Sequence, residues 1–231
     1  MEKNKITVDN YKLIISSSDS IVLEIDCNTK LNIIVKENTH DCKLTIIGNN
    51  NYDINIKLEK ETGLLINSLN RDNSVNASIT LEQDSSISYY HSVLANTDSI
   101  NNFTVKHLGN TSNSYIVNSG VNRNNNKLYF EVNGIVPKDL HDIICDQDSK
   151  IININKGDSK IIPNLIIDSN DITASHSSYI GEIEEYMLFY MKSRGINQEN
   201  IEKIVYRSTI LGRMYLKEEE EEFNKILNEW W

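Results

Sequence analysis

Short runs of β-forming residues alternate with polar corners along most of this chain, from Tyr11 to about Asp171. Apolar and polar residues alternate within many runs, which is the pattern of a strand with one buried face. Asn, Asp, Ser and Gly separate the runs, and successive runs begin roughly ten residues apart. The sequence therefore predicts a mainly β protein with many short strands. The runs are 12–16, 21–25, 31–35, 42–47, 52–58, 63–69, 76–81, 86–94, 103–108, 114–121, 127–136, 149–154 and 159–167.

Such spacing is compatible with three architectures: a sandwich, a barrel or a β-solenoid. Hairpin dipeptides are scarce, and the one clear Asn-Gly pair, Asn133-Gly134, lies inside an apolar run. Asparagine is abundant and is spread through the predicted corners, where it tolerates left-handed backbone and can form side-chain ladders between stacked coils. These two features favour the solenoid, but periodicity by itself leaves all three architectures open.

The pattern changes after Gly181, where apolar residues recur at helical spacing over 182–195. Glutamates occupy the first turn of this predicted helix and a glycine ends it, which are typical helix start and stop signals. Asn197 can cap a second helix, and the charged tail predicts a third. We therefore expect a β-rich core over 1–178 and a C-terminal helical domain over 179–231.

Composition and charge exclude several classes of protein. The chain has 231 residues, a formal net charge of −10 and three cysteines. Such an acidic chain lacks the clustered Lys and Arg that nucleic-acid binding needs. No run of about 18 apolar residues is present for a membrane span, and the first residues do not form a secretion signal. We expect a soluble cytoplasmic protein with reduced thiols that binds neither nucleic acid nor membrane, and, without a P-loop pattern, no nucleotide.

A block over 163–196 carries a long series of residues in fixed order, PNLIIDSNDITASHSSYIGEIEEYMLFYMKSRGI. In order and spacing it resembles the SufB/SufD family of iron–sulfur cluster assembly scaffolds. The matching residues are Pro163, Leu165, Ile167, Asp171, Ala174, Ser175, His176, Gly181, Ile183, Glu185, Leu188, Phe189, Tyr190, Ser193, Arg194, Gly195 and Ile196.

The resemblance implies a fold and a set of partners. The β-rich part would be a right-handed parallel β-helix, or β-solenoid, followed by a small C-terminal α-helical domain. The protein would work with a SufC-type ABC ATPase and a sulfur donor protein, and would hold a transient iron–sulfur cluster. Its β-helix would form a homodimer or a heterodimer with a paralogue. Since the chain lacks the N-terminal helical region of typical members, it resembles a compact, short member.

His176 matches the family histidine that is implicated in cluster assembly at the subunit interface. A neutral imidazole nitrogen is a suitable iron ligand and can also relay protons. The alternative is a structural histidine that caps the last coil.

A cysteine is also expected, because thiolates hold iron–sulfur clusters. The resemblance places an essential cysteine directly after Gln147, but the next residue here is Asp148, and Cys145 lies three positions before it. Side chains alternate along a strand, so Cys145 and Asp148 would lie on opposite faces unless a corner intervenes. Three hypotheses remain: Cys145 substitutes through a local register change, Asp148 is a carboxylate ligand, or the chain has a SufD-like role.

Other candidates are weaker. Cys27 and Cys42 are about fifteen residues apart in successive predicted coils, so they could stack and relay sulfur, or they could be buried free thiols. Glu182, Glu184 and Glu185 could supply further iron ligands near the family histidine, or could only complement the positive end of the first helix.

The resemblance gives this helix a second role, because the same block docks the ATPase in the family. An amphipathic helix would insert apolar anchors into a groove of the partner and place an arginine at the rim. The alternative is that these residues pack the core of the helical domain. The docking candidates are Glu184, Glu185, Leu188, Phe189, Tyr190 and Arg194.

Taken together, the residues and the resemblance predict a scaffold subunit for de novo iron–sulfur cluster assembly that is not itself an enzyme. One alternative is a structural or interaction β-helix of the same complex, without its own cluster site. The other is a β-helix carbohydrate-active enzyme with paired carboxylates in a groove.

Overall fold

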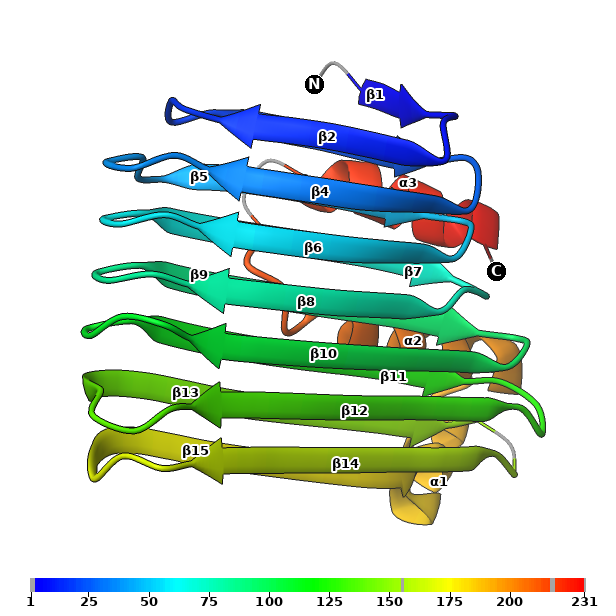
Figure 1. Cartoon of the computed structure of the whole chain (residues 1–231). Helices are drawn as coiled ribbons and strands as arrows, with labels where there is room; N and C mark the ends of the chain where they lie inside the picture. The colour runs from blue at the N-terminus through cyan, green and yellow to red at the C-terminus, as the bar shows by residue number, and fades with distance from the viewer. Residues whose placement is uncertain (1–2, 155, 217–218, 231) are drawn as a thin grey trace.

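The computed structural model describes residues 3–154, 156–216 and 219–230. In this part of the chain, strands wind into a stack of flattened coils, and helices follow them (Figure 1). The strands are β1 (Lys3–Ile6), β2 (Asn10–Ile15), β3 (Ser20–Ile25), β4 (Thr29–Val35), β5 (Cys42–Gly48), β6 (Tyr52–Leu58), β7 (Gly63–Arg71), β8 (Val75–Leu81), β9 (Ser86–Ala95), β10 (Ser99–His107), β11 (Asn113–Asn122), β12 (Lys127–Val136), β13 (His141–Asn153), β14 (Asp158–Ile167) and β15 (Asp171–Glu182).

Consecutive strands lie in different sheets. Over the described residues, the odd-numbered strands form an eight-stranded sheet, and the even-numbered strands form a seven-stranded sheet. Neighbouring strands within each sheet are parallel, as between β4 and β6 or β11 and β13. Each odd–even pair therefore makes one coil, and in Figure 1 the even sheet faces the viewer. The predicted parallel β-solenoid is confirmed, whereas a sandwich or barrel built from hairpins would pair consecutive strands.

The core lies between the two sheets, where identical positions of successive coils stack. One column runs through Leu31, Ile54, Ala77, Phe103 and Val132, all of which are buried. Burying a large aliphatic or aromatic side chain stabilises the fold by roughly 1.5–3 kcal/mol. The coil repeat grows from 19 residues between β1 and β3, through 23 residues between β4 and β6, to 31 residues between β12 and β14.

Asparagine forms the expected ladders, but in a different place. Asn55 Nδ2 donates to Asn32 Oδ1 at 3.1 Å, and Asn164 Nδ2 donates to Asn133 Oδ1 at 2.9 Å, both on the outer face of the even sheet. The left-handed corners more often carry aspartate, so the prediction that asparagine fills them is wrong in part. Among the described non-glycine residues, the left-handed Asx positions are Asn38, Asp41, Asp72, Asp84, Asn124, Asp139 and Asp142.

Three helices follow the strands in the described residues: α1 (Glu185–Ser193), α2 (Gln198–Leu211) and α3 (Glu220–Trp230). The first begins later than predicted, because β15 continues to Glu182. The predicted cap of the second is confirmed, since Asn197 Oδ1 accepts a hydrogen bond from Asn200 N at 2.8 Å. No helix within the described residues is long and apolar enough to cross a membrane.

Helices α2 and α3 pack on the outer face of the odd sheet, behind the strands in Figure 1. Ser92 Oγ on β9 donates to the carbonyl of Ile210 at 2.8 Å, which fastens α2 to the sheet. One apolar cluster joins sheet and helices, so this face of the solenoid is covered. Its buried members are Val22, Ile47, Leu69, Leu94, Val121, Tyr206, Ile210, Met214, Phe223, Leu227 and Trp230.

Candidate functional site

The last coil, made of β14 and β15, is an open end of the solenoid. Within the described residues, no strand pairs with the outer edge of either β14 or β15. The register with β13 shows which β15 side chains face the interior: Ala174 lies opposite Cys145, and His176 lies opposite Gln147. Cys145 and Gln147 are buried, whereas His176 is exposed because no further coil covers it. The interior row of side chains thus ends at an exposed surface, and His176 is part of both the row and this surface.

This surface is largely apolar. Ile180 faces the interior side of β15 and is 44% exposed. Leu165, Ile167 and Ile172 are only half-buried, although they belong to the cluster around Cys145. Exposed apolar residues beside unpaired strand edges are typical of a surface that another β-structure covers.

Cys145 lies one coil inside the open end and is 1% exposed. Burial raises the pKa of its thiol, and a hydrogen bond with Ser114 opposes this only in part. The Ser114 hydroxyl lies 3.1 Å from Nε2 of His107, whose Nδ1 lies 2.8 Å from the Ser112 hydroxyl. The thiol is therefore protonated at neutral pH, and it is the first member of a buried polar chain.

The packing around Cys145 depends on a glycine. A Cβ at Gly134 would lie 2.5 Å from Cys145 Sγ and 3.0 Å from Gln147 Nε2, so a larger residue would displace one of them. Gln147 Nε2 donates to the carbonyl of Asn164 at 3.0 Å, and its Oε1 has no partner among the described residues. By strand geometry, the Cα atoms of Cys145 and His176 are about 8 Å apart, as diagonal neighbours on adjacent strands.

Asp148 does not belong to this interior row. It points out of the solenoid, and its carboxylate forms an ion pair with Arg213, which also donates to the carbonyl of Asn118 at 3.2 Å. The predicted separation of Cys145 and Asp148 onto opposite faces is confirmed by the alternating burial along β13. The structure therefore does not bring Asp148 together with His176.

Glu182 is also distant from His176. It ends β15, six residues further along, which corresponds to about 20 Å of extended strand. There it lines a cavity of about 370 Å³ between β15, α1 and α2, together with Lys150, Met187 and Ile204. One metal centre cannot use both His176 and Glu182 in this arrangement.

Comparison with known families agrees with this geometry. A family model described as "SUF system FeS cluster assembly, SufBD core domain" matches residues 58–209, more than half of the chain. This chain belongs to the SufBD core-domain family. The matched region includes Cys145, Gln147, His176 and helix α1. The resemblance found in the sequence is confirmed.

Two curated relatives of this SufBD chain are iron–sulfur cluster assembly proteins named SufD. The protein from Bacillus subtilis is 31% identical over 109 residues, which are 45% of this chain and 24% of the relative. The protein from Escherichia coli is 37% identical over 43 residues, which are 19% of this chain and 10% of the relative. The matches therefore span a quarter or less of these relatives.

The other two thiols of this SufBD chain do not form a pair. Cys42 starts β5, beside the carbonyl of Ser17, whereas Cys27 follows β3 at the opposite end of the strands and lies near the carbonyls of Ile6 and Val8. Of the two hypotheses, the geometry excludes stacking, because fifteen residues are only about two thirds of a 23-residue coil, and both cysteines are free thiols, with Cys42 buried and Cys27 half-buried. Burial raises the pKa of Cys42, as it does for Cys145.

Helix α1 presents its aromatic side chains to solvent, and none of its residues is buried. Phe189 is 76% exposed and Tyr190 is 57% exposed, while Leu188 is half-buried. The Arg194 guanidinium lies 5.3 Å from the centre of the Tyr190 ring. Glu184 precedes the helix and Glu185 begins it, both exposed. Phe189 and Tyr190 therefore do not pack the core of the helical segment.

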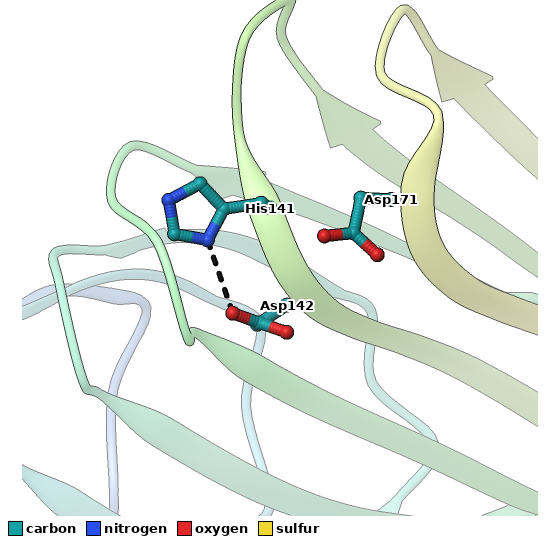
Figure 2. A group of neighbouring side chains, drawn as sticks. All are labelled: His141, Asp142 and Asp171. Carbon is teal, nitrogen blue, oxygen red and sulfur yellow. Dashed lines mark hydrogen bonds and ion pairs between the residues drawn. The ribbon is translucent and has the colours of Figure 1, made fainter.

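Two groups of residues were missed by the sequence analysis. The first is the polar chain of His107, Ser112 and Ser114, which lie at the end of β10, in the following corner and in β11 and carry no local motif. The second is a corner cluster of His141, Asp142 and Asp171, shown in Figure 2. The adjacent His141-Asp142 pair is its only sequence signal, because Asp171 joins it from the next coil.

Proposed function

We propose that this chain is a scaffold subunit for de novo iron–sulfur cluster assembly, with the open end of the solenoid as its working surface. Family membership supports the process. The observation that carries the proposal is the position of exposed His176, diagonal to buried Cys145, at the end of the interior row. The chain would not act as an enzyme, and membership of this family speaks against a carbohydrate-active β-helix.

The nascent cluster is the cargo of this surface. His176 would offer an imidazole nitrogen to iron without any rearrangement, because it is already exposed. Cys145 would first have to lose its proton, because only the thiolate binds iron or accepts sulfur. It would also have to become exposed, because Ala174 on β15 lies next to it and helps to bury it. Ser114 and His107 do not serve as the base, since burial lowers the pKa of His107 to about 4, so the proton would leave to solvent or to an incoming group once the site opens.

The same surface would be covered by a second β-helix, as a homodimer or as a heterodimer with a paralogue. Unpaired edges of β14 and β15 can continue into a partner sheet. Exposed Ile180 and half-buried Leu165 would become buried there. Movement of one subunit against the other would then open the route to Cys145.

A SufC-type ABC ATPase would supply that movement by docking on α1. Its exposed aromatic residues, Phe189 and Tyr190, are suitable anchors for a groove, and Arg194 is placed at their rim. Nucleotide would bind to the ATPase and sulfur would come from a separate donor protein.

A second candidate function is a docking or structural subunit without its own cluster site. Two observations favour it: Asp148 stands where a cysteine is expected and is paired with Arg213, and both curated relatives are named SufD. Cysteine chemistry would then come from a paralogue.

The deciding experiment is anaerobic co-expression with a SufC-type ATPase, followed by iron and sulfide measurement on the purified complex. We expect iron and sulfide in the wild-type complex and a loss of about tenfold or more in Cys145→Ser and His176→Ala, since cluster sites depend on each ligand. Cys42→Ser is the matched control, because it removes another buried thiol far from the open end. A stable wild-type complex without iron would favour the second function, and unfolding of His176→Ala would show a structural histidine.

A further inference from the structure

Three potential metal ligands converge at the corner where strands β13 and β15 begin. His141 and Asp142 lie at the start of β13, and Asp171 begins β15 directly beside His141. One ligand atom from each residue lies within 4.8 Å of the other two. His141 Nδ1 is 3.0 Å from an Asp142 carboxylate oxygen, and in Figure 2 the Asp171 carboxylate faces this pair.

A bulge brings the two adjacent residues together. His141 pairs with Asp171 and Ile143 pairs with Ile172, so Asp142 is an extra residue without a partner in the ladder. Asp142 has a left-handed backbone, with φ of 56°. Successive side chains of a regular strand point to opposite faces, and the bulge removes this alternation. His141 and Asp142 can therefore both meet Asp171.

The fold does not require these side chains. Equivalent corners of successive coils stack in a column, and each has one residue with left-handed backbone. The backbone N–H of that residue donates, at 3.0–3.1 Å, to the carbonyl of the residue just before the left-handed residue of the next corner. Asp142 is the last member of this column. The side chain varies along this column among Asn, Glu, Asp and Thr, and Asn110 precedes the neighbouring member Thr111, so the turn itself needs neither histidine nor paired aspartates. The left-handed residues of the column are Asn38, Glu61, Asp84, Thr111 and Asp142.

The charges at this corner are not balanced by protein groups. In the described part of the chain, no lysine or arginine forms an ion pair with Asp142 or Asp171. The side chains of His141 and Asp142 are 53% and 66% exposed, so an ion from solvent can reach them. Two close carboxylates favour a cation between them, and the imidazole adds a nitrogen donor.

We propose that His141, Asp142 and Asp171 bind a divalent transition-metal ion such as Zn²⁺. One nitrogen and two carboxylate oxygens suit this class, whereas Ca²⁺ and Mg²⁺ prefer oxygen ligands only. Three protein ligands leave a coordination position for water or for another ligand. The site is separate from the interior row, because Cys145 lies four residues along β13 and points into the core. It therefore does not depend on the proposed cluster site.

The test is calorimetric titration of the purified, metal-free full chain with Zn²⁺. We expect one site in the wild type and binding weakened about tenfold or more in Asp171→Asn and His141→Ala, because each removes a ligand. Asp142→Asn serves as a third variant, since asparagine tolerates left-handed backbone. The matched control is Asp84→Asn, which changes a left-handed aspartate of the same column and should bind as the wild type does.

Co²⁺ absorption spectra identify the donors independently. Visible bands without a thiolate charge-transfer band, lost in Asp171→Asn, would support the site. Several outcomes would overturn the proposal: no Zn²⁺ binding by the wild type, unchanged binding in Asp171→Asn, equal weakening in Asp84→Asn, or a thiolate band that assigns the metal to a cysteine. Far-ultraviolet circular dichroism of every variant separates ligand loss from unfolding.

Discussion

Two histidines, His91 and His107, lie inside the solenoid as neutral residues. Burial lowers the pKa of His91 to about 3 and that of His107 to about 4. The His91 ring packs edge-on against Phe103, with centroids 5.1 Å apart, and its Nδ1 lies 3.2 Å from Asn70 Nδ2. Charging either ring would place an ion in the core, so both residues couple folding to pH.

We expect the free energy of unfolding to fall as the pH falls below about 6.5, the pKa of an unfolded histidine. Between that value and the lower pKa of the folded state, the unfolded chain binds more protons, so acid favours unfolding. At pH 5, each histidine then lowers stability by about 2 kcal/mol relative to neutral pH.

Urea unfolding at pH 7.5 and pH 5 measures this effect. His91→Asn should reduce the difference between the two pH values by about 2 kcal/mol, whatever its effect on stability at pH 7.5. His40→Asn is the control, because His40 is exposed. An equal pH difference in the wild type and in His91→Asn would contradict the assignment.

The sequence predicted single side chains well where strand alternation decides their face. Cys145 and Asp148 lie on opposite faces, as an odd separation on one strand requires. Alternation says nothing about distances around the coil, however. It therefore could not decide whether Cys27 stacks on Cys42, and it did not predict the approach of Asp171 to His141.

Among the elements, β13 and β15 carry the candidate site residues, and they were the hardest strands to predict. Interior positions there are polar, with Gln147 and Ser149 on β13 and His176 and Ser178 on β15, so the apolar alternation that marks a strand is lost. Other strands also carry buried polar residues, such as Asn70 on β7 and His91 on β9, but they keep enough aliphatic and aromatic interior positions for the pattern to predict them. Polar residues at interior positions are what we expect if the proposed site lies here, because a site replaces the apolar residues from which strands are identified.

Helix α1 is the other element whose sequence is not explained by its own packing. Exposed aromatic residues gathered on one short helix are typical of a partner-binding surface, so we expect Phe189→Asp to abolish co-purification with a SufC-type ATPase. The thermal midpoint should stay within about 2 °C of the wild type, because surface substitutions change stability by about 0.5 kcal/mol or less.

Leu108→Asp provides the control for this experiment. Leu108 is 49% exposed at a corner of the solenoid, away from α1, so the same change in hydrophobicity should leave the ATPase bound. Retained binding by Phe189→Asp would place the docking surface elsewhere.

The whole molecule is asymmetric in the way it covers its sheets. Helices α2 and α3 cover the outer face of the odd sheet, and polar ladders of asparagine coat the outer face of the even sheet. The end of the stack beyond the last coil has neither cover, and the strand edges there remain unpaired within the described residues. Strands β1 and β2 end the sheets at the other end of the stack, but the proposed site residues lie in or beside the last coil. An uncovered apolar end with unpaired strand edges is typical of a surface that a partner covers.

We therefore expect the open end to form the interface between two β-helix subunits. A single charged residue introduced into this interface should dissociate the dimer. Ile180→Glu places a carboxylate in the interior row at this end, where it would be buried on dimerisation without a partner. Light scattering after size-exclusion chromatography should then show a monomer where the wild type, alone or with its paralogue, is a dimer.

The matched control for this change lies on the same coil. Ile166 is 52% exposed but faces outward from β14, as its pairing with Ile135 in the ladder shows. Ile166→Glu adds the same charge at a similar exposure and should leave the dimer intact. Dissociation by both variants would indicate general charge repulsion, and dissociation by Ile166→Glu alone would place the interface on the outer face of the even sheet. Loss of the dimer in Ile180→Glu alone would locate the contact on the interior row, which also contains His176.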